Sequence, residues 1–137
     1  MAISFQIQEV PFKLTETART KSWIKKIIEL EKKKTGQLNF VLTNDEEVLK
    51  TNIQYLKHNT YTDIITFDDC EDKIINGDII ISIDRVAENA NNFKVPFKTE
   101  LNRVLIHGVL HLCGYGDKTK VAAELMRKKE NWALKKF

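Results

Sequence analysis

The sequence predicts an α/β fold of the α+β kind, in which about five helices pack against one mixed four-stranded sheet. Short segments with β-branched or alternating side chains are interspersed with segments whose apolar residues recur every three or four positions. A chain of 137 residues has no room for a second hydrophobic core, so we expect one compact domain over residues 1–137. Two prolines and the lack of any internal repeat agree with this prediction.

The first half of the chain begins with a predicted strand–helix–strand unit. Polar and apolar side chains alternate over residues 3–10, which predicts a strand. Apolar residues recur at helical spacing over residues 16–34, and Thr35-Gly36 is expected to stop this helix. The apolar run over residues 38–42 predicts the second strand.

The remaining elements follow from capping and turn signals. Asn44, with Glu47 three residues later, has the pattern of a capping box and predicts a helix start. Its inward side chains are expected to be Val48, Leu49, Ile53 and Leu56. Strands are expected over residues 62–67 and 78–82, with Asn76-Gly77 as the turn between them. Three helices are then expected over residues 84–92, 99–113 and 121–134, the first of them burying Val86, Ala87, Ala90 and Phe93.

Composition argues against an exported or membrane-spanning protein. Two cysteines, Cys70 and Cys113, are too few for a disulfide framework. The alternating N-terminus differs from a signal peptide, and no apolar run approaches the ~20 residues that span a bilayer. We therefore expect a soluble cytoplasmic protein without a membrane partner.

Basic residues concentrate at the end of the chain. Residues 118–137 contain seven lysines and arginines against two glutamates, a local net charge of +5, whereas the whole chain carries +3. Two interpretations remain open at this point: a solvated helix face, or an electrostatic footprint for a phosphate backbone.

The most informative segment contains two histidines in an apolar helix. His107 and His111 are four residues apart, so both point to the same side of that helix and require hydrogen-bond partners or a shared cation. Gly114 supplies a helix stop, and Asp117 follows the turn. This spacing is that of metzincin-type zinc sites, in which three protein ligands leave one position open for water. The sequence therefore predicts a zinc-site helix with His107, His111 and Asp117 as ligands, against the alternative that Asp117 caps the next helix.

Gly108 argues against peptidase chemistry at such a site. Metalloproteases with this spacing carry glutamate directly after the first histidine, as the general base. Glycine cannot accept a proton, so a zinc peptidase is the least favoured function.

The stretch from His107 to Tyr115 strongly resembles the signature of the YbeY family, bacterial rRNA maturation factors and single-strand endoribonucleases. Residues 62–67 and 77–82 resemble two strand motifs of the same family, and Glu88-Asn89-Ala90 continues the resemblance in the helix that follows. Length and motif order also match, so the resemblance covers essentially the whole chain.

The resemblance implies a zinc-dependent nuclease with one zinc per chain. It implies single-stranded ribosomal RNA as substrate, notably the 3′ end of the small-subunit (16S) RNA, and association with the ribosome or a ribosomal protein. The alternative is a non-catalytic, zinc-containing ribosome-assembly factor.

Two positions depart from the family pattern. Asp117 stands where the family usually has a third histidine. The family also commonly has a tyrosine followed by an arginine; Tyr55 matches the tyrosine, but the next residue here is Leu56. Lys57 can replace the charge of that arginine but not its bidentate fork. We expect Lys57, Lys118 and Lys120 to contact RNA, the last two because they follow a metal ligand.

Three further side chains near the motifs have open roles. Asp63 is a candidate general base, with a hydrogen bond at a strand end as the alternative. Cys113 is either a small buried residue or a fourth ligand. Tyr115 either touches substrate or packs.

Overall fold

The computed structural model describes residues 2–57 and 62–137. In chain order its elements are β1 (Ala2–Ile7), α1 (Thr17–Leu30), β2 (Lys34–Thr43), α2 (Asp45–Leu56), β3 (Ile64–Asp68), β4 (Ile74–Ser82), α3 (Ile83–Phe93), α4 (Phe97–Leu112) and α5 (Lys120–Leu134). The sheet has the order β1-β2-β4-β3, with β3 antiparallel to β4 and the other pairs parallel. The mixed four-stranded sheet and the five helices of the described residues confirm the predicted fold class.

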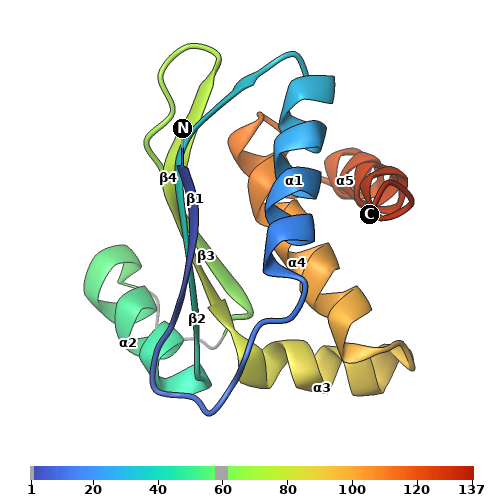
Figure 1. Ribbon diagram of the computed structural model, residues 1–137. Helices are drawn as coiled ribbons and strands as arrows, with labels where there is room; N and C mark the ends of the chain where they lie inside the picture. The colour runs from blue at the N-terminus through green and yellow to red at the C-terminus, as the bar shows by residue number, and fades with distance from the viewer. Residues whose placement is uncertain (1, 58–61) are drawn as a thin grey trace.

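The helices form layers on the sheet (Figure 1). α1 and α4 cover one face, α5 packs on the outer side of α4, and α2 lies on the other side of the sheet. Alternate side chains of the two central strands point into the layer between the sheet and α1 and α4, and all are buried: Leu38, Phe40, Leu42, Ile75, Ile79 and Ile81. No helix within the described ranges combines the length and apolar character needed to cross a bilayer.

α4 is buried on most sides because the sheet, α1, α3 and α5 all contact it. Gly108 lies where α4 meets the sheet: a Cβ there would lie 2.9 Å from Ile64 Cδ1 and 3.1 Å from Ile79 Cδ1. The glycine therefore lets α4 approach β3 and β4 closely. Any larger side chain at this position, such as the glutamate of a metalloprotease, would displace Ile64 and Ile79.

The turn after α4 has the form predicted from Gly114. This glycine has a φ of 114°. Its N–H donates to the carbonyl of His111 at 3.0 Å, and the N–H of Tyr115 donates to the carbonyl of Leu110 at 3.1 Å. These two bonds form a Schellman motif, which ends the helix and reverses the chain so that Asp117 comes to lie beside His107.

The predicted stop of α1 is wrong. The helix ends at Leu30, and Lys32 adopts the left-handed conformation with a φ of 63°. Thr35 and Gly36 lie inside β2 instead. Lys32 thus adopts the left-handed conformation that ends the helix, although the sequence predicted that Gly36 would do so.

The predicted turn at Asn76-Gly77 is also wrong, because both residues lie inside β4. Asn76 Oδ1 accepts a hydrogen bond from the backbone N–H of Gln37 at 2.7 Å, at an irregularity in the pairing of β2 with β4. A Cβ on Gly77 would collide with the carbonyl oxygen of Phe67. The glycine therefore permits close strand pairing, and the chain reverses over residues 69–73.

Some predicted core residues are exposed. α2 buries Val48 and Asn52, so Ile53 and Leu56, 46% and 42% exposed, do not point inward as predicted. α3 buries Val86 and Ala90, whereas Ala87 is exposed and Phe93 is 57% exposed. The Asn44 cap is confirmed, since its Oδ1 accepts from the N–H of Glu47 at 2.9 Å.

Gly114→Ala should destabilise the protein by about 1–3 kcal/mol, because an alanine must adopt the strained positive φ. Gly116→Ala is the matched control: a Cβ added to either glycine would have no heavy atom within 4 Å, and only Gly114 has a positive φ. Urea unfolding of both variants measures the difference. Equal free energies of unfolding would mean that the turn tolerates a side chain at Gly114.

Candidate active site

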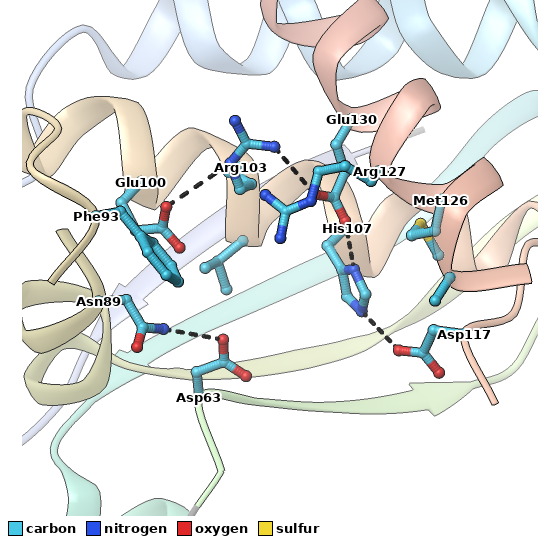
Figure 2. Close-up of a pocket in the computed structure, with 12 residues that line it drawn as sticks. Asp63, Asn89, Phe93, Glu100, Arg103, His107, Asp117, Met126, Arg127 and Glu130 are labelled. Carbon is cyan, nitrogen blue, oxygen red and sulfur yellow. Dashed lines mark hydrogen bonds and ion pairs between the residues drawn. The ribbon is translucent and has the colours of Figure 1, made fainter. Parts of the chain in front are cut away.

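A cavity of about 410 Å³ opens between α3, α4, α5 and the residue before β3 (Figure 2). Ionisable side chains dominate the described residues that line it: Asp63, Glu100, Arg103, His107, Asp117, Arg127 and Glu130. The volume lies within the range of roughly 300–1,000 Å³ typical of ligand sites.

His107 is held in this cavity by two carboxylates. Its Nδ1 lies 2.7 Å from Glu130 Oε2, and its Nε2 lies 3.4 Å from Asp117 Oδ2. An ionised carboxylate only accepts hydrogen bonds, so Nδ1 carries a proton and donates to Glu130, and Nε2 is the ring nitrogen that faces Asp117. The hydrogen bond to Glu130 raises the pKa of His107, against the opposing effect of burial.

Glu130 connects this histidine to two arginines. Arg103 Nη1 lies 3.2 Å and Arg127 Nε 3.8 Å from Glu130 Oε1. Burial pushes the pKa of Glu130 upward, but the hydrogen bonds from His107 and Arg103 and the charge of Arg127 hold it below its ordinary value. Glu130 is therefore an ionised, buried carboxylate.

Sequence reasoning missed Glu130 and treated it as one charge in a basic helix. A signal was present, because Met126, Glu130 and Ala133 recur at helical spacing and form the buried side of α5. A carboxylate at such a position requires partners. Arg103, one helical turn before His107, was also missed, because its role depends on the contact with Glu130.

Asp117 does not cap α5. Thr119 is the cap, since its Oγ1 accepts a hydrogen bond from the N–H of Ala122 at 3.0 Å. Asp117 instead follows the Gly114 turn and lies beside His107 in the lining of the cavity (Figure 2).

His111 is exposed one turn after His107 on α4. Within residues 2–57 and 62–137, no three His, Cys, Asp or Glu side chains converge closely enough to hold a metal ion. The structure thus brings together two of the three predicted ligands, His107 and Asp117.

That pair has the donor chemistry of a zinc site. Two ligand atoms of a tetrahedral zinc lie roughly 3.4 Å apart, given bonds of about 2.0–2.2 Å, and the Nε2–Oδ2 separation is 3.4 Å. Metal-bound histidines generally donate their other N–H to a carboxylate or carbonyl, as His107 does to Glu130. The donor types and the separation of His107 and Asp117 therefore fit a zinc ion.

Asp63 faces the cavity from the residue before β3 (Figure 2). Its Oδ2 accepts a long hydrogen bond of 3.5 Å from Asn89 Nδ2. Burial raises the pKa of Asp63, although the neighbouring charge of His107 acts in the opposite direction. A carboxyl group with a raised pKa is a better proton acceptor than an ordinary aspartate, which suits it to proton transfer.

The lysines predicted to contact RNA do not line the described cavity. Lys57 follows α2 with a left-handed φ of 56°, and Lys118 and Lys120 are exposed beyond Asp117. The cations within the cavity are Arg103 and Arg127.

Tyr115 and Cys113 have packing roles. The hydroxyl of Tyr115 donates to Glu31 Oε1 at 2.7 Å, and Lys129 Nζ lies 2.6 Å from the other oxygen of that carboxylate. Burial raises the pKa of the Cys113 thiol to about 12, as is typical of a packed, protonated cysteine.

Comparisons with known proteins agree over nearly the whole chain. The family model described as "Endoribonuclease YbeY" matches residues 3–137. A Flavobacterium psychrophilum protein named "Endoribonuclease YbeY" is 48% identical, over 98% of this chain and 96% of its own. A protein of the same name from Phocaeicola vulgatus is 44% identical, over 96% of both chains. The solution structure of TM1509 from Thermotoga maritima matches with a TM-score of 0.68 at 26% identity, over 96% of this chain and 87% of that one.

Asp63→Asn should stabilise the chelator-treated protein at neutral pH. Because the pKa of Asp63 is raised in the folded state, its contribution to stability is greatest below the ordinary value of about 3.9 and is lost as pH rises through the folded pKa. The variant's free energy of unfolding, relative to that of wild type, should therefore increase with pH between the unfolded and the folded pKa of Asp63. Above the folded pKa the difference should stay constant.

Urea unfolding across a pH series measures this difference, with the exposed Asp69→Asn as the control for loss of one carboxylate. Parallel curves for wild type and Asp63→Asn would show that burial does not affect the ionisation of Asp63.

Proposed function

This chain belongs to the YbeY family of endoribonucleases, and we propose that it is a zinc-dependent endoribonuclease that cleaves single-stranded RNA. The observation that carries the proposal is the arrangement of His107, with its Nδ1 on Glu130 and its Nε2 facing Asp117, inside a cavity that also contains two arginines.

Zinc, one per chain, is proposed to bind His107, His111 and Asp117. The donor types, the Nε2–Oδ2 distance of 3.4 Å and the carboxylate behind His107 support this ligand set. When bound, zinc supplies Lewis-acid activation of water and of a phosphate oxygen.

The chain's own residues have separate roles in this proposal. Glu130 fixes the tautomer and the orientation of His107. Arg127, whose side chain is 56% exposed, is available to bind a phosphate of the RNA, and Arg103 holds Glu130 in place. Asp63, on the opposite wall, is the candidate for proton transfer.

A role in ribosomal RNA maturation completes the proposal. The sequence resemblance supports ribosomal RNA as the substrate, at the 3′ end of the small-subunit RNA, with the ribosome or a ribosomal protein as partner in the cytoplasm. The packing of Gly108 against Ile64 and Ile79 argues further against a zinc peptidase, because a glutamate there would displace both isoleucines and point into the apolar layer between α4 and the sheet.

Zinc-loaded protein should cleave single-stranded RNA and leave a duplex of the same sequence intact. Asp117→Ala should lose zinc and cleavage together, because it removes one of three ligands, whereas Asp117→His should keep the metal. Elemental analysis and the zinc-induced rise in melting temperature report binding independently of activity.

Asp69→Ala, which removes an exposed carboxylate outside the cavity, is the control and should behave as wild type. Zinc content that survives alanine at His107, His111 and Asp117 would place the metal elsewhere. Zinc-loaded protein without RNA cleavage would favour the assembly-factor alternative.

RNA affinity should fall with salt, and the lysines beside the site should account for more of this dependence than those at the end of the chain. Each phosphate contact contributes a slope of roughly −0.7 in log affinity against log salt for single strands. Lys118→Ala/Lys120→Ala should therefore lower both affinity and slope, and Lys135→Ala/Lys136→Ala should change them less. If the first pair changes neither, the lysines after Asp117 do not contact RNA.

A further inference from the structure

Phe93 is the unusual apolar residue of the cavity. It is 57% exposed at the last position of α3. Single exposed apolar side chains are common on proteins and need no functional explanation. Among the large exposed apolar side chains of the described residues, however, Phe93 is the one that also lines the cavity with His107 and Asp117.

The ring of Phe93 has no aromatic or cationic partner within the described residues. Aromatic pairs elsewhere in the structure are Phe5–Phe40, Phe12–Phe97, Trp23–Phe137 and Tyr55–Phe67. Their rings contact one another, whereas the ring of Phe93 faces the cavity (Figure 2). The face of the Phe93 ring is therefore available to stack on a planar ligand in the cavity.

Asn89 lies one helical turn before Phe93 and lines the same wall. Its Nδ2 makes the 3.5 Å contact with Asp63, and no described residue hydrogen bonds to its Oδ1. α3 thus contributes a flat apolar ring and an amide with hydrogen-bonding capacity, but no charge, to the cavity. The charged lining comes from α4, α5 and the residues before β3 and α5.

This division of the cavity matches the chemistry of a nucleotide. A nucleotide has a charged phosphate at one end and an uncharged planar base, with polar edges, at the other. Aromatic side chains stack on unpaired bases in proteins that bind single-stranded RNA, and amide side chains read base edges. A peptide or a lipid does not combine these two ends in the same way.

We propose that Phe93 and Asn89 form a nucleobase subsite, in which Phe93 stacks on an unpaired base next to the scissile phosphate and Asn89 hydrogen bonds to the edge of that base. The inference rests on the proposed RNA-cleaving function. It also gives a physical reason for selectivity toward single strands, since a base within a duplex must leave its stack before it can reach the ring.

The test uses a single-stranded 2′-O-methyl oligonucleotide that carries one 2-aminopurine, whose fluorescence is quenched on stacking. Wild type should quench it on binding. Phe93→Leu keeps an apolar side chain but loses the aromatic face, so the quench should disappear and the affinity should fall roughly tenfold. Phe93→Trp should restore both. Tyr55→Leu, at a 62% exposed aromatic residue outside the cavity, should change neither.

The outcomes separate the subsite from the function. Wild type that cleaves RNA, together with Phe93→Leu that binds and quenches as wild type does, would overturn the subsite and leave the proposed function standing. Wild type that neither binds nor cleaves single-stranded RNA would overturn both. The affinities for oligonucleotides that differ in the base at this position rank the four bases. If Asn89→Ala leaves this ranking unchanged, Asn89 does not belong to the subsite.

Discussion

The hydrogen bond between His107 Nδ1 and Glu130 joins the two helices on which the proposed active site depends. α4 is fixed against the sheet by Gly108, and the next residue back, His107, consequently points away from the sheet toward α5. Glu130 meets it there at 2.7 Å, in a largely desolvated position where an unpaired carboxylate would be strongly unfavourable. The pairing sets the separation and the rotation of α4 and α5, and it leaves the Nε2 of His107 directed into the cavity.

α5 is held to the body of the protein by the burial of Met126 and Ala133 in the core and by polar contacts. Its outward residues include the exposed Val121 and Leu125. Its inward contacts include Trp23 Nε1, which donates to the carbonyl of Ala133 at 2.8 Å, and Lys129, which pairs with Glu31 of the segment after α1. Since hydrogen bonds are directional, these contacts specify one position of α5 more strictly than apolar packing alone. The position of the Asp117 segment, between α4 and α5, follows from it.

The sequence allowed prediction of the features that depend on local chemistry. The apolar character of α4, the His107–His111 spacing and the turn at Gly114 are properties of one segment and its backbone, so they could be read without any partner. Glu130 and Arg103 could not be assigned in this way, because their role depends on which helix packs beside α4. Asn76 and Gly77 show the same limit: a local turn signal was overridden by the pairing of β4 with strands far away in the sequence.

The carboxylates of the cavity give a further physical argument for a cation. Asp63, Glu100, Asp117 and Glu130 line it together with Arg103 and Arg127, so the described lining carries more negative than positive charge when the histidine is neutral. The pKa of Glu100 is raised by burial despite its arginine neighbours, and Asp63 and Glu130 add to this increase. Bringing a divalent cation to His107 and Asp117 would relieve this repulsion and favour the ionised form of Asp63. Metal binding at the proposed ligands would therefore be coupled to the protonation of Asp63, and this coupling would link the two walls of the cavity.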